Sequence, residues 1–185
     1  MRIVGGKYRG KALAGPKSKA IRPTGDRLRE TIFNILAHGY DDACDGAQVL
    51  DLFAGTGALG LEAMSRGAAS ALFIEQAPES RALIRRNIEA LGLTGVTKLF
   101  RRDATRLGTA GNLGGFDIVF ADPPYGQGLA EVALASALQG GWISDQAICV
   151  IEEKVGVAFE PPAGLVALET RIVGESQVVF LRREA

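Results

Sequence analysis

A glycine-rich stretch in the first half of the chain has residue types suited to a nucleotide-like ligand. It runs Asp51-Leu52-Phe53-Ala54-Gly55-Thr56-Gly57-Ala58-Leu59-Gly60. Glycine lets the backbone turn tightly and approach a ligand closely, and a helix that begins within the stretch offers free N–H groups to a carboxylate or phosphate. Dinucleotide-binding enzymes share this spacing, so it predicts a cofactor of this kind without identifying it.

Two acidic side chains further along could contact the nucleoside part of such a cofactor. Glu75 stands twenty residues after Gly55, at the end of the next predicted strand, where a carboxylate can accept hydrogen bonds from two ribose hydroxyls. Asp103, followed by Ala104, comes just beyond the third predicted strand and could contact an adenine edge. An acid at a helix start and a solvated turn acid are the structural alternatives, and the positions suit NAD and S-adenosylmethionine alike.

The sequence Asp122-Pro123-Pro124-Tyr125 directly follows an apolar strand. Two consecutive prolines fix the backbone and remove two N–H donors, which leaves carbonyl groups and one carboxylate beside a flat aromatic ring. A nucleobase amino group needs such acceptors and its ring needs a stacking partner. The carboxylate and the Pro123 carbonyl could hold the two N–H groups while Tyr125 stacks on the base, an interaction that contributes roughly 1–3 kcal/mol. This pattern favours methyl transfer to an exocyclic amino group.

Alternating strands and helices would place these motifs at one edge of a sheet. The predicted strands are 48–53, 71–75, 96–100, 116–121 and 147–151, and the helices between them are 58–66, 78–91 and 128–139. Apolar runs such as Ile118-Val119-Phe120 suit strands covered on both faces. The pattern predicts a doubly wound, Rossmann-like α/β sheet, in which ligands bind at the carboxyl ends of the strands. The segments 165–173 and 177–181 predict an antiparallel hairpin that closes a mostly parallel sheet.

The start of the chain is basic although the formal net charge is zero. Residues 1–36 hold nine lysines and arginines against two acidic residues. They include a predicted β-hairpin over 2–13 and a helix over 26–38. Such a segment on an acidic body suggests contact with a polyanion, while an ordinary solvated surface is the alternative. We therefore expect a single domain, 1–185, with a basic extension at 1–40 that contacts a polyanion and a catalytic core at 46–185.

Composition excludes several other classes of protein. The single histidine, His38, and the cysteines Cys44 and Cys149 cannot build a four-ligand Cys/His zinc site, and no metal is expected. No apolar run reaches the roughly 18 residues of a membrane helix, and the basic start leads into no signal peptide. The expected location is cytoplasmic.

Taken together, these motifs resemble the RNA small-subunit methyltransferase D family of class I S-adenosylmethionine-dependent methyltransferases. The resemblance covers residues 2–10, Arg22-Pro23-Thr24, residues 26–34 and residues 51–63. It implies methylation of a guanine N2 amino group in 16S ribosomal RNA of the small subunit, without a metal, by a monomer. The implied target-base residues are Asp122, Pro123, Pro124 and Tyr125. The implied cofactor residues are Asp51, Phe53, Ala54, Gly55, Gly57, Glu75, Asp103 and Ala104. The basic segment, with Arg2, Lys7, Arg9, Lys11, Arg22 and Arg27, would contact RNA.

Three alternatives use part of the same residues. An NAD-dependent oxidoreductase would explain the glycine stretch and Glu75 but gives no reason for Asp122-Pro123-Pro124-Tyr125. A DNA adenine or cytosine amino-methyltransferase shares that motif, but the chain has no room for a target-recognition domain. A noncatalytic RNA-binding module would need only the basic segment.

Overall fold

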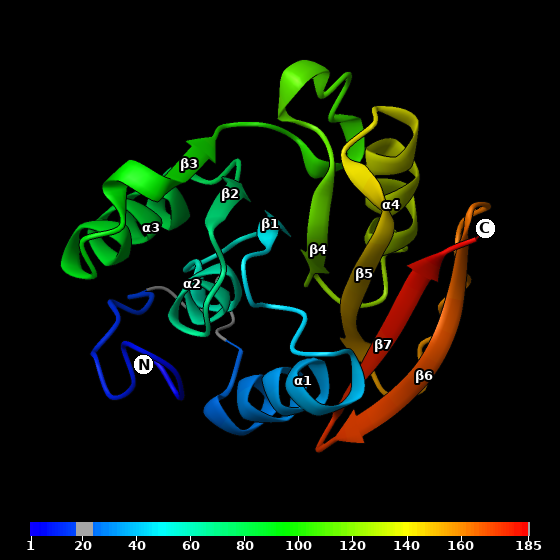
Figure 1. Cartoon of the computed structure of the whole chain (residues 1–185). Coiled ribbons are helices and arrows are strands. Elements are labelled where there is room, and N and C mark those ends of the chain that lie inside the picture. The colour runs from blue at the N-terminus through cyan, green and yellow to red at the C-terminus, as the bar shows by residue number, and fades with distance from the viewer. Residues whose placement is uncertain (18–23, 185) are drawn as a thin grey trace.

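The computed structural model describes residues 1–17 and 24–184 and contains a seven-stranded sheet. The strand order is β3-β2-β1-β4-β5-β7-β6 (Figure 1). The strands are β1 (Gln48–Leu52), β2 (Ser70–Ile74), β3 (Thr97–Phe100), β4 (Phe116–Ala121), β5 (Ile143–Lys154), β6 (Leu165–Val173) and β7 (Ser176–Arg183). The first five run parallel, whereas β7 pairs antiparallel with β5 and β6 antiparallel with β7. The predicted mostly parallel sheet with a C-terminal antiparallel hairpin is confirmed.

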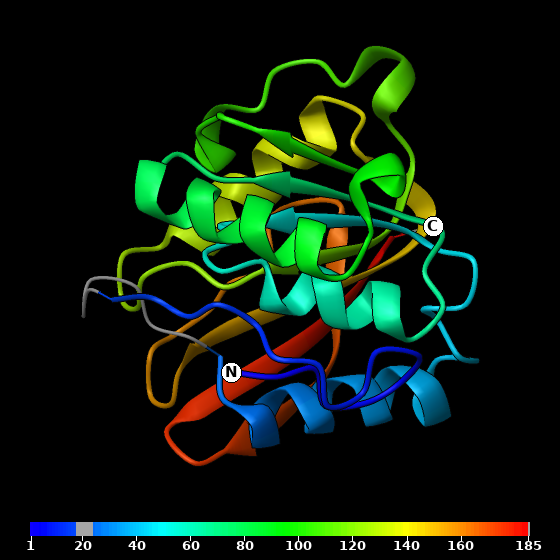
Figure 2. The same cartoon turned by 90° about the vertical axis from the view of Figure 1, so that its left-hand side faces the viewer.

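Helices cover both faces of the sheet, as the apolar strands require. They are α1 (Asp26–Gly39), α2 (Ala58–Ser65), α3 (Pro78–Ala90) and α4 (Leu129–Gln139). Alternate strand residues point to opposite faces, so Val49 and Phe73 pack in one core cluster with α1, α2 and α3, while Leu50 and Leu72 pack in the other with α4. In Figure 2, α2 and α3 lie in front of the sheet and α4 lies behind it.

The structure differs from the predicted elements in three places. Strand β5 begins at Ile143 and ends at Lys154, well beyond the predicted 147–151. Three short 3₁₀ helices, Thr94–Val96, Ala104–Arg106 and Gly111–Leu113, lie in connections that carry too little periodicity to predict them. The predicted hairpin over 2–13 has no strands, because its two arms are joined by a single antiparallel bridge between Arg2 and Ala12.

The N-terminal arm, which comprises residues 1–17, is attached to the sheet through the buried carboxylate of Glu62 on α2. Glu62 is 0% exposed and accepts hydrogen bonds from the backbone N–H groups of Val4 and Gly5 at 3.0 and 2.8 Å. The backbone of the arm also reaches the end of α2, where the Lys7 N–H donates to the Ser65 carbonyl oxygen at 2.7 Å. Gly6 permits this approach, because a Cβ atom there would lie 2.1 Å from that oxygen. The arm is therefore packed as part of the fold.

Of the seven basic side chains of residues 1–36 that the structure describes, one is buried. Arg29 is 0% exposed and pairs with Glu62 and with Asp26. Burial lowers the pKa of Arg29, and the two neighbouring carboxylates oppose that shift. Arg29 consequently belongs to the interior of the protein, and its charge does not contribute to the basic surface.

Within the two described ranges, no helix is long and apolar enough to cross a membrane.

Candidate functional site

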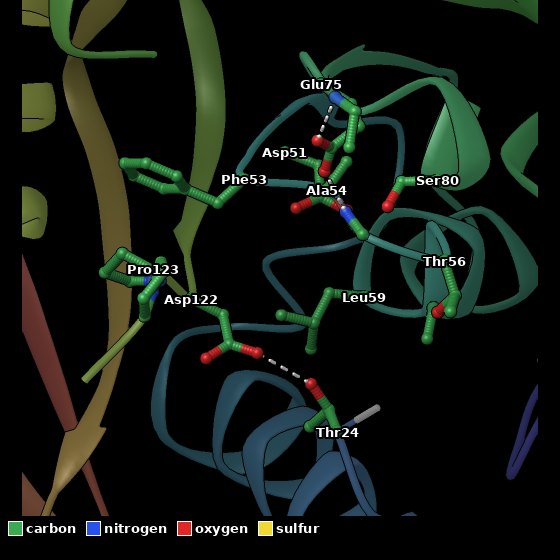
Figure 3. Close-up of a pocket in the computed structure, with 14 residues that line it drawn as sticks. Thr24, Asp51, Phe53, Ala54, Thr56, Leu59, Glu75, Ser80, Asp122 and Pro123 are labelled. Carbon is green, nitrogen blue, oxygen red and sulfur yellow. Dashed lines mark hydrogen bonds between the residues drawn. The ribbon is translucent and has the colours of Figure 1, made fainter. Parts of the chain in front are cut away.

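A cleft of about 460 Å³ opens at the carboxyl ends of β1, β2 and β4, as the sequence predicted for this fold. Its volume lies within the usual range of small-molecule sites, about 300–1,000 Å³. Figure 3 shows its lining side chains converging from the glycine loop, α2, the residues that follow β4 and the segment that leads into α1. The lining residues are Thr24, Asp51, Phe53, Ala54, Gly55, Thr56, Ala58, Leu59, Glu75, Ala77, Ser80, Asp122, Pro123 and Pro124.

The glycine loop between β1 and α2 turns through three residues with positive φ. Phe53, Gly55 and Gly57 have φ angles of 53°, 60° and 82°. A side chain in this region is strained, so glycine is favoured at 55 and 57. Gly60 has another reason, because a Cβ atom there would lie 2.5 Å from the Phe73 ring on β2. The loop thus presents its backbone to the cleft, while Gly60 lets α2 pack closely on the sheet.

Two carboxylates stand beside the glycine loop. The Glu75 carboxylate accepts from the Gly55 N–H at 2.7 Å and from the Ala77 N–H, just before α3, at 3.0 Å. Asp51 accepts from the Gly60 N–H at 3.0 Å and is only 1% exposed. Burial raises the pKa of Asp51 well above its usual range; the Glu75 charge adds to the shift and the Gly60 N–H opposes it. This part of the cleft therefore favours a ligand that brings positive charge and hydrogen-bond donors.

The proline motif forms the opposite wall of the cleft. Asp122, Pro123 and Pro124 all line it, and Pro123 is buried. One Asp122 carboxylate oxygen accepts a hydrogen bond from the Thr24 hydroxyl at 3.0 Å (Figure 3). The sequence analysis assigned no role to Thr24, although Arg22-Pro23-Thr24 is one of the stretches that carry the family resemblance. A hydroxyl 98 positions away from the carboxylate it contacts gives no periodic signal.

Four of the predicted catalytic and cofactor residues do not line the cleft, and one of them is Gly57 of the glycine loop. The Tyr125 hydroxyl donates to a carboxylate oxygen of Glu152 on β5 at 2.8 Å. Asp103 accepts from the backbone N–H and hydroxyl of Thr105, at 2.9 and 2.6 Å, and these bonds lower the pKa of Asp103. Asp103 thereby caps the 3₁₀ helix that begins at Ala104. The Ala104 side chain is buried. The adenine contact predicted for this pair stays a prediction.

The predicted RNA-contacting side chains are exposed wherever the structure describes them: Arg2, Lys7, Arg9, Lys11 and Arg27. Arg22 lies outside the described residues. The Lys7 ammonium lies 5.4 Å from the centre of the Tyr8 ring. However, Tyr8 also packs against the core, so its ring serves the fold as well as the surface.

The part of the chain that the structure describes holds no group of three or more His, Cys, Asp and Glu side chains arranged to bind a metal ion.

Comparison with known proteins finds relatives that span the whole chain. Residues 1–182 match the family model described as "Conserved hypothetical protein 95". Ribosomal RNA small subunit methyltransferase D of Escherichia coli K12 is 37% identical, covering 100% of this chain and 91% of that protein. The protein of the same name from Haemophilus influenzae is 30% identical, covering 94% and 89%. The solved structure "Putative methyltransferase yhhF from Escherichia coli" superposes with a TM-score of 0.84 and 35% identity, covering 100% and 98%. These matches include both the N-terminal arm and the cleft.

Proposed function

The chain belongs to the family described as Conserved hypothetical protein 95 and to the RNA small-subunit methyltransferase D family. On that premise we propose that it transfers a methyl group from S-adenosylmethionine to the exocyclic N2 amino group of a guanine in 16S ribosomal RNA. The observation that carries this proposal is that one cleft is lined jointly by the glycine loop, two carboxylates and the proline motif. A cofactor site and an acceptor site for an amino group are thus adjacent.

The charges of the cleft fit S-adenosylmethionine. This cofactor carries a sulfonium and an ammonium group against one carboxylate, so its net charge is positive at neutral pH. Glu75 provides negative charge, and Asp51 provides a buried carboxyl group whose ionised form a cationic ligand would stabilise. The start of α2 provides backbone N–H groups that can face the cofactor carboxylate. We assign Asp51, Phe53, Ala54, Gly55, Gly57 and Glu75 to the cofactor, with Asp103 and Ala104 as further candidates. When bound, the cofactor supplies an electrophilic methyl group.

The residues of the proline motif would present the acceptor amine. A nucleobase amine is a poor nucleophile because its lone pair is delocalised into the ring. The Asp122 carboxylate and the Pro123 carbonyl can accept its two N–H groups, which favours a more pyramidal nitrogen. Thr24 donates to the same carboxylate and thereby limits its rotation. Fixing two reactants in line can lower a barrier by about 7–11 kcal/mol. The base must leave its stack to reach the cleft.

The exposed basic residues of the N-terminal arm suit a contact with the RNA backbone, because neutralising phosphates releases counterions. We therefore assign residues 1–40 to RNA contact and residues 46–185 to catalysis. The proposed partner is the small ribosomal subunit. We propose that this chain binds it as a monomer in the cytoplasm.

The decisive experiment is methyl transfer from radiolabelled S-adenosylmethionine to small subunits that lack the modification, followed by digestion and nucleoside identification. We expect label in N2-methylguanosine. Label in another base would retain the enzyme class and overturn the guanine assignment, and acceptance of DNA alone would favour a DNA amino-methyltransferase. No label with RNA, DNA or subunits would reopen the oxidoreductase alternative.

The variant Asp122→Ala tests the role of the acceptor carboxylate. We expect turnover to be abolished while calorimetry shows nearly unchanged cofactor affinity, because the cofactor is assigned to the opposite wall of the cleft. Near-normal methylation by this variant would remove Asp122 from the mechanism.

A further inference from the structure

The side chain of Tyr125, which lies in the loop between β4 and α4, is held at its hydroxyl end by residues of the two strands β5 and β7. A carboxylate oxygen of Glu152 accepts a hydrogen bond from the Tyr125 hydroxyl at 2.8 Å. The Ser176 hydroxyl oxygen lies 2.9 Å from the Tyr125 hydroxyl oxygen. Ser176 also donates to that Glu152 oxygen at 3.1 Å. Both Glu152 and Ser176 are buried. The three oxygen atoms therefore form a closed triangle inside the protein.

The antiparallel end of the sheet makes this triangle possible. Strand β7 begins at Ser176, which pairs with Lys154 at the end of β5, so its side chain lies near Glu152 two residues earlier on β5. The next residue of β5, Glu153, accepts a hydrogen bond from the Gly126 N–H at 3.1 Å. The loop after the proline motif is thus anchored to β5 both at the Tyr125 side chain and at the following backbone N–H.

A buried carboxyl group is costly, and stacking alone does not require one. A phenylalanine at position 125 would offer the same flat face without a polar atom to satisfy. Burying a polar group costs several kcal/mol unless it is hydrogen-bonded. A buried glutamate that does no more than satisfy the Tyr125 hydroxyl gives no advantage over an apolar pair at these two positions, so we look for a benefit in the hydrogen bond itself. Fixing the ring at its Cβ atom and at its hydroxyl oxygen fixes the ring axis. Because a phenolic O–H lies in the plane of its ring, the hydrogen bonds to Glu152 and Ser176 also favour one orientation of the ring about that axis. Such support of contacting residues is what holds a reactive geometry in place.

We propose that Glu152 and Ser176 are positioning residues that set the plane of the Tyr125 ring for stacking on the target base. They act through the Tyr125 hydroxyl and do not contact the base. This inference rests on the proposed function and on the base-stacking role that the sequence predicts for Tyr125. It adds to them a specific set of supporting contacts from β5 and β7.

A double-mutant cycle tests whether Glu152 acts through the hydroxyl. With small subunits as substrate, Tyr125→Phe and Glu152→Gln should each lower kcat on the order of tenfold, the equivalent of about 1.4 kcal/mol. The KM for subunits should change less than twofold, because phosphate contacts supply most of the affinity. In the Tyr125→Phe background, Glu152→Gln should have no further effect. Ser176→Ala should lower kcat in the wild-type background alone. Glu175→Gln, an exposed neighbour with the same change of charge, is the matched control.

A second measurement observes the ring without any turnover. The chain has three tyrosines, so tyrosine ring-¹³C labelling gives a simple NMR spectrum. Glu152→Gln and Ser176→Ala should shift the Tyr125 ring signals and leave those of Tyr8 and Tyr40 in place. Equal losses of kcat from Glu152→Gln in both backgrounds, or unchanged Tyr125 signals, would overturn the inference while leaving the proposed function standing. Failure of the wild-type protein to methylate RNA would instead overturn the proposed function.

Discussion

Replacing Glu62 by glutamine should strongly destabilise the protein, although the two side chains have nearly the same volume. One carboxylate oxygen accepts from the Val4 N–H and lies 3.4 Å from the Arg29 guanidinium. The other accepts from the Gly5 N–H and from the Arg66 guanidinium, at 2.8 and 3.0 Å. Every neighbour is a donor. Whichever way the amide turns, its NH₂ group must face one of these donor pairs, and Arg29 loses a buried counter-charge.

The size of this effect follows from the burial of both partners. Glu62 and Arg29 are each 0% exposed, so solvent cannot replace the lost interaction. Breaking a buried ion pair by removing one partner costs about 3–5 kcal/mol. For a chain of this length 1 kcal/mol corresponds to roughly 2–4 °C in Tm, so the expected fall is about 6–20 °C.

Urea unfolding at pH 7 and thermal unfolding would measure the change, with Glu89→Gln on the exposed side of α3 as the control, expected within about 0.5 kcal/mol of wild type. Hydrogen exchange should show faster exchange of the Val4 and Gly5 amides in the Glu62→Gln protein. A loss below about 1 kcal/mol, or unchanged exchange at both amides, would refute the view that this carboxylate attaches the N-terminal arm.

Three further predictions concern the cleft and the basic surface. The pKa of Asp51 is raised in the folded protein. The free energy of unfolding that this group contributes is therefore fully present below its pKa in the unfolded chain and is lost as pH rises through its pKa in the folded protein. In Asp51→Asn this decline in urea-measured stability should disappear, and an unchanged pH profile would contradict the burial argument. Thr24→Val should lower kcat about tenfold with unchanged cofactor affinity in calorimetry, whereas Thr24→Ser should retain activity; equal loss in both variants would remove the hydroxyl from the argument. Replacing Lys7, Arg9 and Lys11 by glutamine should lower the salt slope of RNA binding by up to about 3, and an unchanged slope would assign this surface to another role.

The sequence predicts well those features that repeat along the chain or follow a strand. Alternating apolar strands and helices identify the doubly wound sheet, and Gly55, Glu75 and Asp122 meet in one cleft because each follows a parallel strand. The direct contacts between residues distant in sequence could not be predicted in this way. The hydroxyl of Thr24 on Asp122 and the carboxylate of Glu152 on Tyr125 depend on tertiary packing.

Charge is the property for which the sequence was least informative. A count of basic residues treats Arg29 and Arg27 alike, yet Arg29 is fully buried and Arg27 is exposed. Both lie on α1, and the apolar stripe of a helix does not reveal which neighbouring arginine finds a buried carboxylate. The same holds for Glu62, which the sequence shows only as one acid among apolar residues of α2.

Residues of the N-terminal segment, 1–36, form hydrogen bonds with both walls of the cleft. The segment is therefore part of the folded domain and not a detachable RNA-binding tail. The Asn87 side chain, only 1% exposed, accepts from the Ala14 N–H at 2.6 Å and donates to the carbonyl oxygens of Ala14 and Thr56, the latter in the glycine loop. Thr24 makes the corresponding contact with Asp122 on the other wall. Deleting the segment would leave the buried Asn87 and Glu62 without these partners, at a cost of about 1–3 kcal/mol for each unsatisfied polar group and more for a charged one. A truncated protein would therefore lose stability and active-site order together with RNA affinity. Neutralising exposed lysines and arginines one at a time separates these effects, because it leaves the backbone contacts of the arm intact.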